Sequence, residues 1–470
     1  MSEKSTVGSP ERPLRVAIIG AGPSGFYAAE SLLKSKDTNA TVDMIDRLPT
    51  PFGLVRGGVA PDHQGIKKVV RIYDRIASDK RFRLFGNIRL GVDITVDDLR
   101  STHDAIIYAF GAESDRKMNV PGEDLPGSHS ATEFVGWYNG HPDYTNFSFD
   151  LSVESAVVVG VGNVAIDVAR VLARHPDELK PTDIAAHAIP PLEASGIKTI
   201  YLLGRRGGPQ AAFSPKEIRE LAKVENADLI VSPEQAALDA VSEAWLPTAD
   251  RDAKKNTEFL MKQATTPAEG KPRQVVLKFL VSPVEFIADD SGKLTRMRLR
   301  KNELYADKRG NPRPRAIDEY EEIDVGIAFK AVGYRGVRVP GVPFHESWGI
   351  VPNVDGRVTA SEESTEPLPG EYVVGWAKRG PSGLIGTNKA DSIATVVGLL
   401  EDYKAGGTPP NRSDKGPDAL ESFLNANGRT YVSYQGWKAI DAAELARGEA
   451  AGKLREKVVT IDEMVKIAEG

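Results

Sequence analysis

Cysteine is absent from the 470 residues of this sequence. Without thiolates the chain cannot ligate an iron–sulfur cluster in the usual way, and it cannot form a redox-active disulfide. Any electrons that the protein handles must therefore reside on a bound organic cofactor and leave to another molecule. We expect no metal site. The lack of disulfides agrees with a reducing compartment, and we expect a cytoplasmic protein.

A strong excess of charge of one sign is also missing, because the formal net charge is only −6. This balance gives no electrostatic footprint for nucleic acid, and we expect no such partner. No apolar run is long enough to predict a membrane span, and residues 1–13 show no pattern of a signal peptide. The length predicts two or three domains. Our working expectation for the oligomeric state is a monomer.

The N-terminal region contains the pattern of a nucleotide-binding βαβ unit. In order, it has a buried-strand run, a glycine motif, a helical pattern and a second strand: Leu14 to Ile19, Gly20-Ala-Gly22-Pro-Ser24-Gly25, Phe26 to Leu33, and Thr41 to Ile45 followed by Asp46. Gly20 permits a tight turn, Gly22 lets the backbone approach a pyrophosphate, and Gly25 lets helix and strand pack closely. Asp46 lies 21 residues after Gly25, where a carboxylate can accept hydrogen bonds from ribose hydroxyls. Glycines also mark ordinary turns, but the full order of elements favours a nucleotide site.

A second unit of the same kind begins at Ser155. It has a buried-strand run, a glycine motif that opens a helix, and a second strand: Ala156 to Val159, Gly160-Val-Gly162-Asn163-Val164-Ala165, and Thr199 to Leu203. The strand ends in Gly204-Arg205-Arg206, without a carboxylate. Two guanidiniums suit a dianionic 2′-phosphate, which arginine can hold in a bidentate fork. The alternative is a solvated basic turn. Asp46 therefore indicates FAD in the first unit, and the arginine pair indicates NADP in the second.

Several longer segments resemble adrenodoxin reductase and the related bacterial ferredoxin–NADP reductases, from about Arg15 into the C-terminal region. The segments that carry the resemblance are Pro51 to His63, Gly160 to Asp167, Gly204 to Gly207 with Ala212 to Glu217, and Gly375 to Ile385. One departure is Gly207-Gly-Pro-Gln210, where the family often has Gly-Pro-Leu-Gln. This difference affects the loop near the phosphate and leaves both arginines in place.

The resemblance implies a role for individual residues. FAD would contact Ser24, Asp46, Leu54 and Leu90, and the residues closing over its ring would be Trp376, Gly383, Leu384 and Ile385. NADP would be held by Gly162, Asn163, Val164, Ala165, Arg205, Arg206 and Glu217. His63 would lie at the flavin face. Its candidate partners in handling protons are Asp167 and Glu220, of which Glu220 lies three residues past Glu217 on one helical face. For His63 the alternative is a purely structural role, and for Trp376 it is a place in the core.

These observations predict an α/β protein with two Rossmann-like dinucleotide-binding domains, of which the FAD domain is discontinuous. We expect FAD domain segments at 1–111 and 336–470 and an NADP domain at 112–335. Lys278 to Ile287 and Thr295 to Leu304 alternate like strands of a small antiparallel sheet. The tail from Asn411 is expected to be a peripheral cover.

The expected function is transfer of electrons from NADPH through FAD to a ferredoxin-type iron–sulfur protein, which the resemblance implies as the acceptor. Alternatives are an FAD-bearing electron-input subunit of a larger enzyme, an NADPH:quinone-type diaphorase, and a non-catalytic NADP sensor. Ferredoxins are usually acidic, so we expect a basic docking surface. The best candidates are Arg251, Lys254, Lys255 and Lys262, with Lys378 and Arg379 beside the flavin.

Overall fold

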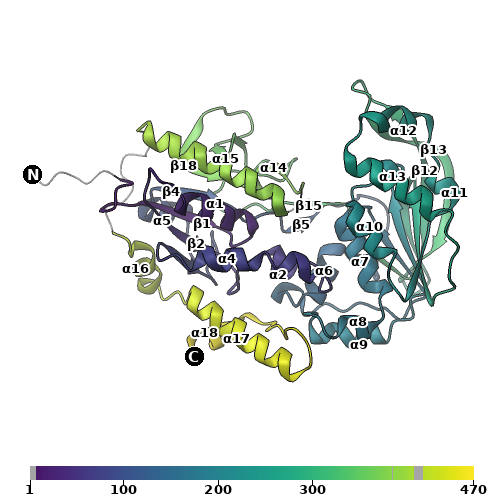
Figure 1. Cartoon of the computed structure of the whole chain (residues 1–470), viewed down its shortest axis with the longest axis horizontal. Coiled ribbons are helices and arrows are strands. Elements are labelled where there is room, and N and C mark those ends of the chain that lie inside the picture. Colours follow the sequence, from purple (N-terminus) through teal and green to yellow (C-terminus); the bar gives the residue numbers. More distant parts are fainter. Residues whose placement is uncertain (1–6, 384, 407–415) are drawn as a thin grey trace, which may run out of the picture.

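The computed structural model describes residues 7–383, 385–406 and 416–470. The molecule is elongated and has two lobes, with the N-terminal strands in one lobe and the middle of the chain in the other (Figure 1). Among the described residues, no helix has both the length and the apolar character needed to cross a membrane. The predicted α/β class is confirmed, because each lobe is built around a sheet whose core strands are parallel.

The first lobe contains a seven-stranded sheet in the order β16-β17-β18-β4-β1-β2-β3. Its strands are β1 (Leu14–Ile19), β2 (Ala40–Ile45), β3 (Phe82–Phe85), β4 (Ala105–Tyr108), β16 (Asn353–Val354), β17 (Arg357–Thr359) and β18 (Pro367–Val373). The strands from β18 to β3 are parallel, and β16 and β17 add an antiparallel edge. Segments from both ends of the chain thus share one sheet. Because every residue of β1 is buried, its sequence is a continuous apolar run apart from Arg15.

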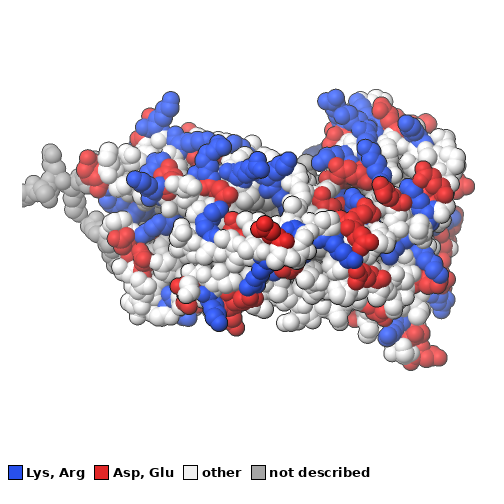
Figure 2. All heavy atoms as spheres, turned by 60° about the horizontal axis from the view of Figure 1, so that its bottom comes forward, with Lys and Arg blue, Asp and Glu red and all other residues white. Residues whose placement is uncertain are grey.

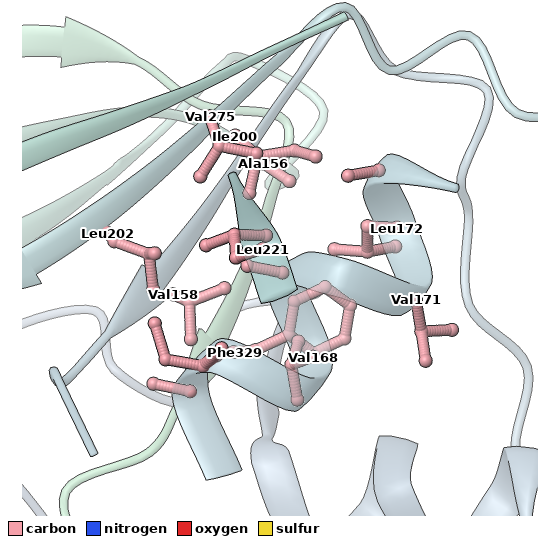
Figure 3. Packing of buried hydrophobic residues seen from close by; sticks show 14 of the residues in the cluster. Ala156, Val158, Val168, Val171, Leu172, Ile200, Leu202, Leu221, Val275 and Phe329 are labelled. Carbon is pink, nitrogen blue, oxygen red and sulfur yellow. The ribbon is translucent and has the colours of Figure 1, made fainter. Parts of the chain in front are cut away.

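The second lobe contains a six-stranded, wholly parallel sheet in the order β6-β14-β7-β8-β10-β9. Its strands are β6 (Ser128–Ser130), β7 (Ser155–Val159), β8 (Thr199–Gly204), β9 (Ala227–Ile230), β10 (Arg273–Phe279) and β14 (Ile327–Lys330). Helix α7 (Asn163–Ala173) covers the strands, and Val168 and Leu172 lie against the apolar residues of the sheet, including Phe329 (Figure 3). This core fixes the position of the second glycine turn, which lies at the carboxyl end of β7.

A three-stranded antiparallel sheet belongs to the same lobe. It consists of β11 (Val281–Ala288), β12 (Leu294–Ala306) and β13 (Pro312–Asp324). The predicted antiparallel pairing is confirmed for its first two strands, but Lys278 is the penultimate residue of β10 in the parallel sheet. The third strand was not predicted. It is polar, carries two prolines and lies at an edge, which is where a sheet tolerates proline.

Two short strands join the lobes. β5 (Ser114–Asp115) lies on the way out of the first lobe and β15 (Tyr334–Arg335) on the way back, and they pair with each other in antiparallel fashion. The two connections therefore run side by side, which limits the relative movement of the lobes.

The C-terminal tail packs more deeply than a peripheral cover. Trp437 in α17 (Tyr434–Ala450) is 3% exposed and packs edge-on against Phe52, with ring centroids 5.5 Å apart. Lys457, beyond α17, is buried, and its ammonium group lies 3.1 Å from the Asp183 carboxylate of the second lobe. The tail thus contributes to the core of the first lobe and touches the second. Burial lowers the pKa of the Lys457 side chain to about 7, against the attraction of Asp183.

Candidate functional site

A cleft of about 2060 Å³ lies where the lobes meet and is lined by both glycine motifs. This volume exceeds the roughly 300–1,000 Å³ of a pocket for one small ligand, so the cleft has room for two nucleotides. The predicted site residues that line it are Gly20, Gly22, Ser24, Asp46, Leu54, His63, Leu90, Gly160, Gly162, Asn163, Val164, Ala165, Asp167, Arg205, Arg206, Glu217, Trp376, Gly383 and Ile385. Of the remaining three, Gly25 and Glu220 lie behind this lining, and Leu384 lies outside the described residues.

The first glycine turn has the shape that a dinucleotide pyrophosphate requires. Gly20 has a φ of +113°, and a Cβ there would overlap the backbone of Ala109. A Cβ on Gly25 would overlap the carbonyl oxygen of Gly20, so this glycine serves close packing and does not face the cleft. In front of Gly22, by contrast, no atom lies within 4 Å of the position of a Cβ. The N-terminus of α1 (Pro23–Leu33) therefore faces open space, and its free backbone N–H groups favour binding of an anion.

The second turn repeats this geometry. Gly160 has a φ of +137°, and a Cβ there would overlap the carbonyl oxygen of Ala331. Gly162 again faces open space at the start of α7. The side chain of Asn163 accepts a hydrogen bond of 2.8 Å from the Ser214 backbone N–H, so it also fastens the next loop. Both turns thus fit a phosphate-bearing ligand.

Asp46 follows the last residue of β2 and faces the first turn. Its carboxylate accepts hydrogen bonds from the backbone N–H groups of Ala21, at 2.7 Å, and Leu48, at 2.9 Å. Burial raises the pKa of Asp46, although these two N–H groups oppose the shift. A carboxylate has about four acceptor positions, so lone pairs remain for ribose hydroxyls on the cleft side.

Arg205 and Arg206 stand at the corresponding place in the second unit, directly after β8. Arg205 is exposed and Arg206 half-buried, and within the described chain neither side chain forms an ion pair with a carboxylate. Burial, followed by the positive charges of Arg205 and Arg313, lowers the pKa of the Arg206 guanidinium. Arg313 belongs to β13 and also lines the cleft. Our sequence analysis missed it because neither a motif nor a predicted strand marked that segment.

His63 lies where the lobes meet, among acids that come from distant parts of the chain. It precedes the short helix α3 (Gln64–Lys67), whereas Asp167 is on α7 and Glu217 and Glu220 are on α10 (Pro215–Leu221). The Nε2 atom lies 2.8 Å from a Glu220 oxygen and 3.3 Å from a Glu217 oxygen, and Nδ1 lies 3.9 Å from Asp167. Nε2 is buried and, among the described residues, has no hydrogen-bond partner.

Arg170 neutralises part of this acidic group. Its side chain is fully buried, and its nitrogens lie 2.6 Å from Asp62, 2.7 Å from Asp167 and 3.3 Å from Glu217. Burial raises the pKa of both Asp167 and Glu217. For Asp62 burial is outweighed, and the guanidiniums of Arg170 and Arg174 lower its pKa to about 2. The cluster thus holds carboxyl groups of unequal proton affinity beside one histidine.

The segment predicted to close over the flavin borders the same cleft. Trp376 is half-buried, and its ring lies 5.4 Å from that of Tyr334 in the interlobe strand β15. Its indole N–H donates to the carbonyl oxygen of Ser382 at 3.2 Å. Gly383 has a φ of +79° and precedes α15 (Ile385–Lys404). The loop therefore presents an aromatic ring and a helix start to the cleft.

The two cations beside this loop are held internally. Lys378 is only 16% exposed in its side chain and lies 3.0 Å from the Asp391 carboxylate. The Arg379 guanidinium donates to the hydroxyl of Ser382 and to the side-chain oxygen of Asn388. Both residues thus make contacts within the loop and its helix. On α13 (Arg251–Gln263), Arg251 and Lys262 are exposed, whereas Lys254 and Lys255 are half-buried and the Lys254 ammonium donates to the Pro247 carbonyl oxygen at 2.8 Å.

Comparisons with known proteins agree with this geometry. Residues 14–180 match the family model described as pyridine nucleotide-disulphide oxidoreductase. The chain is 43% identical to the NADPH-ferredoxin reductase FprA of Mycobacterium tuberculosis, with 98% of this chain and all of the relative covered. It is 40% identical to the mitochondrial NADPH:adrenodoxin oxidoreductase of Arabidopsis thaliana, with 97% of this chain and 96% of the relative covered.

A solved structure agrees over the same extent. The structure of M. tuberculosis FprA in complex with NADPH superposes with a TM-score of 0.90 at 42% identity, covering 98% of this chain and all of the other. The similarity thus extends over nearly the whole length of the chain. The chain belongs to the family of the NADPH-ferredoxin and NADPH:adrenodoxin reductases.

Proposed function

We propose that this protein is an FAD-containing oxidoreductase that takes electrons from NADPH and passes them to a ferredoxin-type iron–sulfur protein. The observation that carries the proposal is one cleft bordered by two glycine turns with opposite charge beyond them, a carboxylate in one case and arginines in the other. When bound, FAD supplies the conversion between a hydride donor and one-electron acceptors. The protein's own residues bind, orient and shield the two nucleotides.

The first unit would hold FAD. The backbone N–H groups at the start of α1 would face its pyrophosphate, and Asp46 would accept the ribose hydroxyls. Ser24, Leu54 and Leu90 would line its path through the cleft, and Trp376, Gly383 and Ile385 would exclude water from the ring. The domain division at residues 111 and 335 is part of this proposal, and it is supported by the strands from 14–108 and 353–373 that share one sheet.

The second unit would hold NADP(H). Gly162 and the start of α7 would face its pyrophosphate, and Arg205 and Arg206 would bind the 2′-phosphate. Glu217 has a raised pKa because of its burial and borders the cleft next to His63. It would contact the nicotinamide end of the coenzyme, where the two units approach each other.

His63, Asp167 and Glu220 would hold and move protons beside the flavin. Hydride transfer needs no acid or base of the protein, but a one-electron acceptor carries no proton away. The buried Nε2 atom without a hydrogen bond, with acids at 2.8 Å and 3.3 Å, supports this role. His63 can accept a proton at Nε2 and pass it to Glu220, which lies behind the cleft lining and is one-third exposed.

The second candidate is an NADPH:quinone-type diaphorase, with the electron-input subunit of a larger enzyme as a variant of it. The open cleft supports the diaphorase, because a small acceptor would reach a flavin ring bound there. A cytoplasmic location also remains a proposal, which cell fractionation with an antibody to the protein can test.

Stopped-flow spectroscopy of the purified protein tests the proposal. We expect FAD to be extractable, flavin absorbance to bleach with NADPH, and the reduced protein to reduce an added ferredoxin faster than a neutral quinone. A preparation that takes up no FAD refutes the proposal. A quinone that is preferred over every ferredoxin tested favours the diaphorase.

A further inference from the structure

The hairpin formed by β12 and β13 reaches the cleft at its turn. Asn311, Pro312 and Arg313 line the cleft together with Arg205 and Arg206. The turn is held by Asp307, whose carboxylate accepts hydrogen bonds of 2.9 Å from the backbone N–H groups of Arg309 and Asn311. No motif predicts a role for this hairpin, and the parallel sheet of the lobe does not need it for its own hydrogen bonding.

The antiparallel sheet supports the arginine loop directly. The side-chain amide of Asn302 in β12 donates to the Arg205 carbonyl oxygen at 3.0 Å and to the Ser282 hydroxyl at 2.9 Å. Leu304 of the same strand lies within 3.9 Å of the position that a Cβ on Gly207 would occupy. Tyr305, which follows Leu304, is the register partner of Arg313. The hairpin thus brings Arg313 next to the loop that carries the arginine pair.

The positive charge of Arg313 at the hairpin turn is only partly compensated. Arg313 uses Nε to donate to Asp307 at 2.9 Å, and its side chain is 53% exposed. Among the described residues, its two terminal amino groups have no hydrogen-bond partner. The charge of Arg313 is also one of the causes of the lowered pKa of Arg206. Three guanidiniums beside one another repel, and a dianion between them removes that repulsion.

We propose that Arg313 is a third guanidinium of the 2′-phosphate site, aimed by Asp307 and brought there by the β12–β13 hairpin. The inference rests on the proposed use of NADPH. The alternative is that the Arg313–Asp307 pair only stabilises the turn. An exposed pair of this kind contributes little to stability, and on this alternative its loss would leave ligand binding unchanged.

Calorimetric binding of two probes to the full-length, FAD-loaded protein tests the inference. The probes are adenosine 2′,5′-bisphosphate and adenosine 5′-monophosphate, which differ in the 2′-phosphate. We expect Arg313→Ala to weaken the bisphosphate about tenfold, as for one charge-assisted hydrogen bond. Binding of the monophosphate should change less than about twofold. Arg313→Glu should weaken the bisphosphate further, because its carboxylate repels the phosphate.

Arg315→Ala is the matched control. Arg315 lies on the same strand and also pairs with an acid, Glu303, but it does not border the cleft. Its variant should bind both probes like the wild type. Three results overturn the inference: bisphosphate affinity unchanged in Arg313→Ala, both probes weakened equally, or an equal loss in Arg315→Ala. If the wild type itself does not prefer the bisphosphate, the proposed NADPH specificity fails as well, which distinguishes the two failures.

Discussion

The two glycine turns have nearly the same backbone, and they differ in what stands at the end of the following strand. Gly20 and Gly160 have φ values of +113° and +137°, and each donates its N–H to the end of the next strand, to Ile45 and Leu203 respectively. The first unit then places Asp46 against its own turn. The second places Arg205 and Arg206 in a loop that a separate sheet supports.

Under the proposed function, coenzyme choice is encoded in this difference. The turn itself binds a pyrophosphate through backbone N–H groups, which every dinucleotide can use. A carboxylate needs no further scaffold, because the backbone of its own unit holds it by two hydrogen bonds. Two neighbouring arginines repel each other, so they need a loop held from outside, and β12 provides the contact. Specificity for a phosphate therefore required more structure than specificity for hydroxyls.

The largest effect is expected from exchanging the third small residue of each motif. Gly25→Ala forces a Cβ onto the Gly20 carbonyl oxygen. Overpacking of this kind lowers the free energy of unfolding by about 3 kcal/mol, at the upper end of its usual range. We expect protein without FAD and a strongly lowered yield. Ala165→Gly removes a methyl group from a buried helix start and should cost only about 1 kcal/mol. Thermal unfolding and the ratio of FAD to protein measure both. A Gly25→Ala protein with full FAD content would show that the first turn tolerates a methyl group at its third small residue, as the second turn does at Ala165.

The second effect concerns the arginine pair. Each charge-assisted hydrogen bond to a phosphate contributes about 1.5–3 kcal/mol, or roughly one to two decades in affinity. We expect the combined Arg205→Ala and Arg206→Ala variant to raise the KM for NADPH by about 10²–10⁴-fold. The KM for NADH should change little, because NADH lacks the 2′-phosphate, and steady-state assays with an artificial acceptor give both values. Equal use of the two coenzymes by the wild type contradicts the role of the pair.

Asp46→Asn should have a smaller effect, on FAD alone. The substitution removes the charge and also one of the two hydrogen bonds from the Ala21 and Leu48 N–H groups, because an amide has a single acceptor oxygen. We therefore expect FAD to dissociate at least about 10-fold more readily. NADP(H) affinity of the protein that retains FAD should stay at the wild-type value. Equilibrium dialysis gives the first quantity and calorimetry the second.

The pH dependence sharpens this test. Burial raises the pKa of Asp46 above 3.8, and the carboxylate is the form that accepts the ribose hydroxyls. As pH falls through that raised pKa, wild-type FAD affinity should fall, and it should do so at a higher pH than for an exposed aspartate. In Asp46→Asn the affinity should be lower throughout and flat in this range. Free FAD fluorescence from pH 7 to about 4, with circular dichroism to exclude unfolding, measures it. If FAD affinity falls with pH equally in both proteins, Asp46 is not the group that causes the pH dependence.

The sequence predicted those features whose cause lies within a few residues. Both βαβ units could be found because a tight turn demands glycine at a fixed place and a buried parallel strand demands an apolar run. The strand β13 could not be predicted, because its alternation is masked by an exposed, charged surface and by Pro312 and Pro314. His63 and Glu220 meet across 157 residues of sequence, and the sequence pointed to Glu220 only through its spacing from Glu217 on one helical face.

The same limit applies to the basic residues. Lys378 and Arg379 carry charge in the sequence, and tertiary contacts with Asp391, Ser382 and Asn388 engage both of them within the chain. The depth of the tail was missed for a related reason, since the partners of Lys457 lie in three distant segments: Asp183, the carbonyl of Arg56 and Asn139. A charge pattern shows which residues are ionised and leaves open which of them face solvent.

The smallest effect is expected on the outer surface. Lys and Arg side chains crowd the rims of both lobes beside the hollow between them (Figure 2). Exposed charges act over only about 8–10 Å at ordinary salt, so only cations near the cleft can steer an acidic partner. Helix α13 meets this condition, because Asp250, Asp252 and Ala253 at its start line the cleft. We expect Lys254→Glu with Lys255→Glu to slow reduction of ferredoxin about 3- to 10-fold.

Stopped-flow rates across a salt series separate docking from chemistry. Flavin reduction by NADPH should be unchanged in the double variant, because neither lysine lines the cleft. Raising the salt should slow the wild type and bring the two proteins together, since screening removes the difference. Lys293→Glu is the control, an exposed lysine in the turn between β11 and β12 that does not line the cleft. If a neutral quinone shows the same salt dependence as ferredoxin, the charges beside the second unit play no part in docking. In that case, the two units differ only in the coenzyme that each binds.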